Sequence, residues 1–490
     1  MPSKRLPSRR LAVVVLAAGH GRRMKSTLPK VLHPVAGRPS LWHILTAAAR
    51  LRPASISVVV GMPSRDRIEE AIRSWAIRPA PAFVDQGRQL GTGHAVASAE
   101  SATEGADDVL VLPGDDPLVT VDHLRILLKV HARTGSAATI LTTELDDPTG
   151  YGRVRRAGDE LLGIVEESDA DRRVRAIREV STLFYVFRRD DLYRSLPRVG
   201  RDNRQREHYL PDVLAVLKEK GERVSAAPVD LGGSLGINTR RGLAAVSRIL
   251  RDRIVQGHMR KGVTFVDPDT SYVDIDVRIG PDTMIQPNTL LQGRTRIGAG
   301  CTIGPSTRIV DSSVGDGAEV TFAVVRGSKI GPRASVGPFA SLRPGTVLME
   351  ASKAGTFVEI KATRVGRGSK VPHLAYMGDA TIGDRVNIGA GSITCNYDGV
   401  QKHRTTIADD AFVGSDTMLV APVKIGKRAV TGAGSAITRD VPEGALAIER
   451  ADQRIVRGYA DRRRGRRSRA EGTSGDGGGA SSGSGGGGRG

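Results

Sequence analysis

Residues 279–309 read IGPDTMIQPNTLLQGRTRIGAGCTIGPSTRI, and this stretch decides the fold of the second half of the chain. An aliphatic residue recurs at every sixth position and is often followed by glycine: Ile279, Ile285, Leu291, Ile297, Ile303 and Ile309. A period of six is neither helical nor the alternation of a simple strand. It predicts a triangular β-solenoid, in which each hexapeptide forms one flat side and a corner. The aliphatic side chains are then expected to point inward and to stack on one another.

The same period of six recurs in three further groups of positions along the chain. It includes Ile330, Val336, Leu342 and Leu348, then Ile382 and Ile388, then Ile407, Val413, Leu419 and Ile425. The intervals from Leu348 to Ile382 and from Ile388 to Ile407 are not multiples of six. We expect extra residues to leave the coil there as loops, which often carry function on a rigid scaffold. These two breaks contain His373, Tyr376, Asn396, Tyr397 and Lys402.

The first half alternates short apolar strands with helical patterns. Strands are predicted at residues 11–17, 55–60, 109–112 and 139–143, and helices at 41–51, 67–75 and 123–131. This alternation predicts an open parallel sheet wound with helices. The predicted organisation is a basic arm at 1–10, a nucleotide-binding domain at 11–239, a linker helix at 240–262, the solenoid at 263–455 and a disordered tail at 456–490, which is basic and then rich in Gly and Ser.

Composition narrows the class of protein. The formal charge of the 490-residue chain is +20, but the arginines cluster at its two ends without interleaved aromatics, so we predict no nucleic-acid partner. The apolar run at 11–18 is shorter than a membrane span and leads directly into a glycine-rich loop, so no membrane insertion is expected. Only two cysteines occur, Cys301 and Cys395, which fits a reducing compartment and a cytoplasmic protein.

The first candidate site follows the strand at 11–17. The glycines of the loop that begins Gly19-His20-Gly21 allow backbone N–H groups to approach a phosphate, and Arg23 and Lys30 add cations. Solvated loop charges are the alternative interpretation of these two side chains. Asp115 follows a second predicted strand, where a carboxylate suits Mg²⁺ bound with substrate phosphates. An ordinary turn aspartate is the alternative, and Asp116 could take the same role.

The second candidate site lies in the breaks of the solenoid. A transfer of an acetyl group to an amine requires a base, and His373 is the candidate because imidazole is the side chain most often used for this task near neutral pH. Tyr376 lies close to it in sequence, and Lys361 and Lys402 are nearby cations that could bind a phosphate. A structural histidine is the alternative interpretation.

Motifs in both halves support a family assignment. The first half contains LAAGHGRRM (16–24), LPKVLH (28–33), QLGTGHA (89–95) and DDPTGYGR (146–153). The second half contains GPFASLRPG (337–345), FVEIK (357–361), HLAYMGD (373–379), NIGAG (387–391), TCNYDG (394–399) and FVGSD (412–416). Together these resemble the bifunctional N-acetylglucosamine-1-phosphate uridyltransferases/glucosamine-1-phosphate N-acetyltransferases. The resemblance implies a Rossmann-like α/β nucleotidyltransferase domain followed by a left-handed parallel β-helix of hexapeptide repeats.

The resemblance also implies roles in a Mg²⁺-dependent uridylyl transfer. UTP and the sugar would contact Ala17, Ala18, Gly19, Gln86, Gly91, Thr92, Gly152, Glu166, Ser181 and Asn238. Arg23 and Lys30 would stabilise the phosphoryl transition state, and Asp115 and Asn238 would bind Mg²⁺.

For the acetyl transfer, the resemblance implies that His373 is the base. Glucosamine 1-phosphate would be bound by Arg343, Lys361, Tyr376, Asn387 and Lys402. Acetyl-CoA would contact Ala390, Asn396, Tyr397, Ser415, Ala433 and Arg450. Three chains of the family assemble, so each site is expected to include residues of neighbouring subunits.

The first half departs from the family pattern at three places. Ser181-Thr182-Leu183 stands where the family has Asn-Thr-Gly, Leu235 replaces a glutamate, and Pro113 replaces a tyrosine. One alternative is therefore an acetyltransferase with an altered or weakened nucleotidyltransferase half, of different sugar or nucleotide specificity. Others are a first half that serves only as a scaffold and a nucleic-acid binder that acts through its basic ends.

Overall fold

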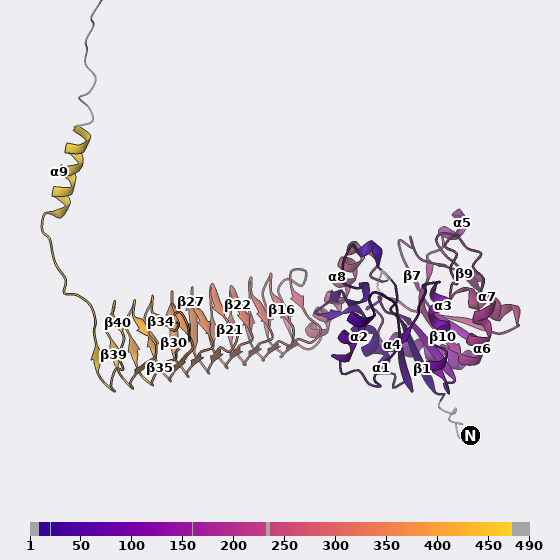
Figure 1. Ribbon diagram of the computed structural model, residues 1–490, viewed down its shortest axis with the longest axis horizontal. Helices are drawn as coiled ribbons and strands as arrows, with labels where there is room; N and C mark the ends of the chain where they lie inside the picture. The colour runs from indigo at the N-terminus through magenta and orange to yellow at the C-terminus, as the bar shows by residue number, and fades with distance from the viewer. Residues whose placement is uncertain (1–8, 20, 159, 232–235, 473–490) are drawn as a thin grey trace, which may run out of the picture.

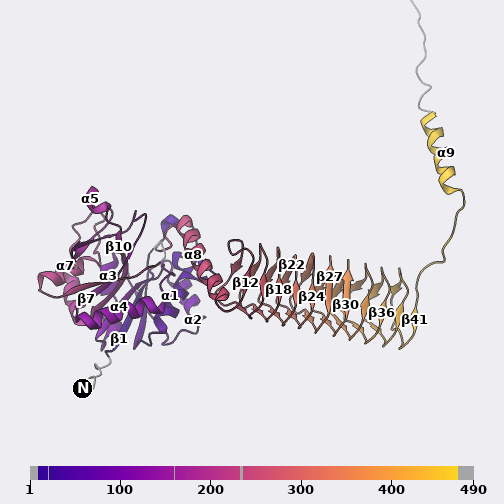
Figure 2. The same cartoon turned by 180° about the vertical axis from the view of Figure 1, so that it is seen from behind.

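The computed structural model describes residues 9–19, 21–158, 160–231 and 236–472. These residues form a rounded α/β body followed by a long, narrow prism (Figures 1 and 2). Leu235, one of the departures from the family pattern, lies outside the described residues, as do most of the predicted N-terminal arm and residues 473–490.

The α/β body is built on one twisted sheet. Its main strands lie in the order β11 (Val224–Pro228), β7 (Ala138–Glu144), β10 (Glu179–Arg188), β6 (Asp108–Pro113), β1 (Leu11–Leu16), β4 (Ser55–Val60) and β5 (Ala82–Asp85). The predicted strands are present, but the sheet is not wholly parallel, because β10 runs antiparallel to both β6 and β7. A hairpin of β8 (Arg153–Ala157) and β9 (Glu160–Val165) pairs with β10 and extends the sheet.

Helices cover both faces of this sheet, which explains why its strands are continuous apolar runs. On one face α1 (Ser40–Ala49), α2 (Arg65–Arg73) and α4 (Val121–Thr134) contribute Leu41, Ile68 and Leu124 to the core. On the other face α3 (Thr92–Ala97), α6 (Arg189–Ser195) and α7 (Asp212–Glu219) contribute Val96, Leu192 and Leu214. The carboxyl ends of β1 and β6 therefore open between two packed layers.

The two bodies are joined by α8 (Arg240–Met259) and by a direct contact. The contact is made by the short hairpin of β2 (Pro34–Val35) and β3 (Arg38–Pro39), just after Lys30. Arg38 forms an ion pair with Asp276, and the Ile275 amide donates to the Ala36 carbonyl at 3.0 Å. Gly37 has φ +81°, and a Cβ there would lie 2.5 Å from an Asp274 carboxylate oxygen, so only glycine fits.

The prism has three flat sides, as the hexapeptide period predicts. Its sheets contain eleven, ten and nine parallel strands and begin with β12 (Thr264–Phe265), β13 (Tyr272–Val273) and β14 (Arg278–Ile279), respectively. The periodic aliphatic residues are buried in a single continuous cluster that includes Ile285, Ile303 and Ile425.

The prediction that both breaks in the period are loops is wrong for the first break. Lys353 pairs with Lys370 and Lys370 with Asn387, so the coil continues without interruption. Each of these turns is one residue shorter than the turn from Ser335 to Lys353, because a corner is tightened rather than extended. His373 therefore ends a regular strand, β30 (Lys370–His373), instead of lying in an insertion.

The second break is a loop, as predicted. It lies between β34 (Ile393–Cys395) and β35 (Thr405–Ile407) and contains an isolated antiparallel bridge between Tyr397 and Lys402. The residues that leave the coil here carry predicted substrate contacts out from the flat side of the prism.

The tail differs from the sequence-based expectation of disorder, because residues Tyr459–Gly472 form a helix, α9, that projects beyond the end of the prism (Figure 1). Arginine and alanine have high helix propensity, so this segment can be helical without burying apolar surface. Within the described part of the chain, no helix has the length and apolar character needed to cross a membrane.

Candidate active sites

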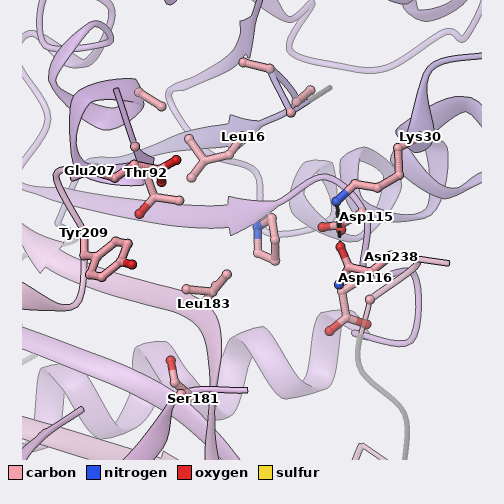
Figure 3. Close-up of a pocket in the computed structure, with 18 of the residues that line it drawn as sticks. Leu16, Lys30, Thr92, Asp115, Asp116, Ser181, Leu183, Glu207, Tyr209 and Asn238 are labelled. Atoms are coloured by element: carbon pink, nitrogen blue, oxygen red, sulfur yellow. Dashed lines mark hydrogen bonds and ion pairs between the residues drawn. The ribbon is translucent and has the colours of Figure 1, made fainter. Parts of the chain in front are cut away.

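A cavity of about 460 Å³ opens at the carboxyl ends of β1 and β6 (Figure 3). Every residue predicted for UTP, sugar, transition-state or metal contact in the first half lines this cavity: Ala17, Ala18, Gly19, Arg23, Lys30, Gln86, Gly91, Thr92, Asp115, Gly152, Glu166, Ser181 and Asn238. The cavity lies where an open α/β sheet binds its ligands. The loop after β1, the turn after β6 and the β8–β9 hairpin thus contribute to one site.

One end of the cavity is charged and suits phosphates. The Lys30 ammonium contacts a carboxylate oxygen of Asp115 and lies 3.1 Å from the side-chain oxygen of Asn238. Figure 3 shows these three side chains meeting at one point. Arg23 lies on the short 3-10 helix η1 (Arg22–Met24) at the rim, with an exposed side chain. The cavity end therefore offers cations for a phosphate and two oxygen ligands for a divalent metal.

Asp116 is less suited to the metal role than its neighbour. It is only 2% exposed, and its carboxylate accepts a hydrogen bond from the Leu118 amide at 3.3 Å. Burial, together with the negative charge of Asp115, raises the pKa of Asp116 to about 7. Since Asp115 is the carboxylate that contacts Lys30, the geometry favours Asp115 at the charged end.

Another part of the cavity lining, formed by Gly152 and Glu166, presents groups suited to a sugar. Burial raises the pKa of Glu166, with smaller contributions from the charges of Asp212 and Asp169. Gly152 lies against it, and a Cβ at this glycine would be 2.9 Å from an Ile164 methyl group and 3.2 Å from a Glu166 oxygen. Because Gly152 has no side chain, its backbone can lie close to Ile164 and Glu166, and any other residue at this position would crowd them.

In the prism, Lys361, a predicted sugar-phosphate ligand, and Asn396, a predicted acetyl-CoA contact, meet at one aspartate. Lys361 lies 2.9 Å from a carboxylate oxygen of Asp379, and the Asn396 amide donates to the same oxygen at 2.5 Å. Burial alone would raise the pKa of Asp379, but hydrogen bonds from Lys361 and Asn396 hold it below its usual value. Asp379 in turn raises the pKa of Lys361. The sequence analysis did not assign Asp379 a role, although it ends the motif HLAYMGD.

The sequence analysis also assigned no role to Asp398 and His403, a pair that holds the loop between β34 and β35 in place. The His403 ring nitrogen lies 2.6 Å from Asp398, whose other oxygen accepts from the amides of Val400 and Gln401. These bonds hold the pKa of Asp398 far below its usual value. The pair thereby closes the loop that carries Tyr397 and Lys402. The spacing of an Asp and a His across a predicted loop was the available signal.

Three of the predicted acetyl-CoA contacts form a column along one corner, between the first and second sheets of the prism, whereas Asn396 and Tyr397 lie in the loop after β34. Ala390, Ser415 and Ala433 follow successive strands of the first sheet, β33 (Asn387–Ile388), β36 (Phe412–Val413) and β39 (Val430–Thr431). The Arg450 guanidinium donates to the Ala433 carbonyl at 2.8 Å. His373 lies on the same corner at the preceding turn, and its side chain is exposed.

Other predicted contacts of the prism lie on its flat sides. Arg343 donates to Glu359 at 2.9 Å, and Glu359 pairs in register with Tyr376 on the second sheet. Asn387 lies on the first sheet, beside Lys370. The structure thus brings these residues to neighbouring surfaces of the prism, where Arg343 is exposed and Tyr376 and Asn387 are half-buried.

Comparison with known proteins agrees with this two-part architecture. Residues 13–206 match the MobA-like NTP transferase domain, residues 276–311 match the bacterial transferase hexapeptide, and residues 380–401 and 404–439 match the hexapeptide repeat of succinyl-transferase. A nucleotidyltransferase domain joined to a left-handed parallel β-helix of hexapeptide repeats defines a class of two-domain transferases.

Within this class, the relatives share one name over nearly the whole chain. The chain is 47% identical to the bifunctional protein GlmU of Streptomyces coelicolor, over 92% of this chain and 94% of the relative. The corresponding protein of Heliobacterium modesticaldum is 48% identical over 92% and 98%, and that of Mycobacterium bovis is 47% identical over 92% and 92%. The chain therefore belongs to the GlmU family.

Proposed function

We propose that the chain makes UDP-N-acetylglucosamine in two transfers. The prism acetylates glucosamine 1-phosphate with acetyl-CoA, and the α/β body transfers uridylyl from UTP to the resulting N-acetylglucosamine 1-phosphate. The observation that carries this proposal is the convergence of the first-half residues on one cavity in a chain of the GlmU family.

In the uridylyl transfer, a phosphate oxygen of the sugar phosphate attacks the α-phosphorus of UTP, and pyrophosphate leaves. Arg23 and Lys30 neutralise charge on the phosphates, since phosphoryl chemistry depends mainly on positioning and charge. Asp115 and Asn238 would hold Mg²⁺: their oxygens already converge on a cation, the Lys30 ammonium. Oxygen ligands suit this metal, and when bound it supplies further neutralisation of the phosphates.

In the acetyl transfer, the amine of glucosamine 1-phosphate attacks the thioester carbonyl, and the thiol of CoA leaves. His373 accepts the proton that the amine releases, which its exposed position at the corner permits. Lys361 and Lys402, with Arg343 on the adjoining strand, hold the phosphate. Acetyl-CoA lies along the corner formed by Ala390, Ser415 and Ala433.

A homotrimer would complete this second site. The corner that carries His373 also carries an apolar ladder, Phe322, Phe339, Phe357 and Leu374, whose exposed fractions are 39%, 56%, 57% and 64%. The rings of Phe339 and Phe357 stack at 5.3 Å. A contiguous apolar surface of this kind is typical of a protein interface. Its position beside His373 supports sites that are shared between subunits. The two cysteines are free, which supports a cytoplasmic enzyme.

The proposal is tested by measuring both half-reactions on the purified chain. We expect release of pyrophosphate from UTP and N-acetylglucosamine 1-phosphate, and release of CoA from acetyl-CoA and glucosamine 1-phosphate. Absence of pyrophosphate release from a folded protein with Mg²⁺ present would overturn the first assignment, and absence of CoA release would overturn the second.

A further inference from the structure

Leu183 lies in an irregular part of β10 that borders the first cavity. The pairing of β10 with β7 shifts register between Ser181 and Tyr185. The Thr182 hydroxyl donates to the Leu141 carbonyl at 2.6 Å and fixes this irregularity. Leu183 has φ +60°, in the left-handed region, where the Cβ of a non-glycine residue crowds the backbone. Such a conformation at the wall of a cavity calls for a functional explanation.

The Leu183 side chain occupies a central place in the cavity. Figure 3 shows it between the charged end, with Asp115 and Asn238, and the opposite side, with Tyr209. It also packs against the apolar core on that face of the sheet, which fixes its position. The cavity thus has an apolar step between its charged end and the side that carries Tyr209.

The neighbouring polar side chain, Ser181, adds little hydrogen-bonding capacity to the cavity wall beside Leu183. The Ser181 hydroxyl lies 3.2 Å from the Tyr185 hydroxyl, which is itself fully buried. The Ser181 hydroxyl therefore already has a hydrogen-bond partner in the core, the Tyr185 hydroxyl. A ligand group at this position meets a short hydroxyl and an isobutyl group instead of a set of hydrogen-bond donors.

We propose that Leu183 is a specificity-determining residue of the sugar subsite, where its isobutyl group contacts the methyl end of the 2-acetamido group and selects acylated over unacylated sugar 1-phosphates. This inference rests on the proposed uridylyl transfer. An apolar contact of this size discriminates by roughly tenfold or more, because a hydroxyl or an ammonium at the same position gains nothing from it and loses water.

The test compares kcat/KM for N-acetylglucosamine 1-phosphate with kcat/KM for glucose 1-phosphate, at a fixed UTP concentration. For Leu183→Gly, we expect the ratio to fall roughly tenfold, with the KM for UTP and the acetyl transfer unchanged. Glycine adopts positive φ freely, so this variant should keep the fold. Leu183→Met preserves an apolar contact and should retain most of the ratio.

A matched control is available at Arg206. This residue also has a positive φ, +52°, and lies between Gln205 and Glu207 of the same cavity, but its own side chain is exposed outside it. Arg206→Gly relieves comparable strain and should leave the ratio unchanged. An unchanged ratio in Leu183→Gly, or an equal gain with both sugars, would overturn the inference. A wild-type chain that uses neither sugar phosphate would instead overturn the proposed function.

Discussion

The two halves of the molecule differ in how completely one chain encloses its candidate site. In the α/β body, all the predicted contacts line one cavity between packed layers. On the prism, His373 and Ser415 are exposed on a corner, while Lys361 lies on an adjoining side. An open sheet with crossing loops forms a crevice by itself, whereas a straight prism offers only flat sides and corners. We therefore expect the second site to need residues of neighbouring chains, and the first site to be complete within one chain.

The largest expected effect separates the two sites directly. His373→Ala should reduce the rate of acetyl transfer by about 10³-fold, since a positioned general base contributes about this much. Uridylyl transfer should persist, because His373 lies on the prism and contributes nothing to the cavity. Both rates are measured on the same preparation. A parallel loss of both reactions in a correctly assembled protein would contradict the separation of the sites.

A neighbouring pair of arginines tests the cavity. Arg23→Gln should lower the kcat of uridylyl transfer by about 10²-fold, because one cation at the developing charge is lost. Arg22 lies beside it on η1 but does not line the cavity, so Arg22→Gln is the matched control and should have little effect. Pyrophosphate release is the measurement. Equal losses in the two variants would indicate general electrostatic attraction instead of a placed cation.

A smaller effect is expected at the aspartate that organises the prism ligands. Asp379→Asn removes the charge partner of Lys361, so the KM for glucosamine 1-phosphate should rise about tenfold, equivalent to one charge-assisted hydrogen bond. Asp410→Asn, which removes the partner of the exposed Arg385 on the same prism, should leave KM unchanged. If kcat fell instead of KM rising, Asp379 would act in the chemical step.

The smallest expected effect is on the free energy of unfolding of the α/β body, and the prism should not be affected. Burial would raise the pKa of Asp108, but hydrogen bonds from His131 and Arg9 hold it below its usual value. The stabilisation is therefore present above the unfolded pKa and is lost as pH falls through the lower folded value. Asp108→Asn should cost about 2 kcal/mol at pH 7, or about 5 °C in Tm.

Thermal melts of the two proteins at pH 7 and at pH 3 provide the measurement. The difference in Tm should shrink at the lower pH, and the transition of the prism should not move at either. A shift of the prism transition would show that the two bodies unfold as one unit.

Sequence periodicity predicted the prism well because each inward aliphatic, such as Ile303 or Val413, stacks on a copy of itself. It failed at the first break, since counting in sixes cannot distinguish a tightened corner from an inserted loop. In the cavity, the motifs predicted which residues converge, but not the left-handed conformation of Leu183. That conformation follows from the pairing of β10 with β7, which joins segments far apart in the sequence. The role of Asp379 likewise emerges only when successive turns are stacked.

The length of the prism has a consequence for how the intermediate passes between the two sites. Six steps along the first sheet separate β12 at the junction from β30 with His373, and at about 4.8 Å per step these span about 29 Å. Because β12 and β30 are strands of one continuous sheet, this span cannot shorten by bending of the chain between the two bodies. N-acetylglucosamine 1-phosphate must therefore leave one site and diffuse to the other, and the free intermediate should exchange with labelled compound added to the medium.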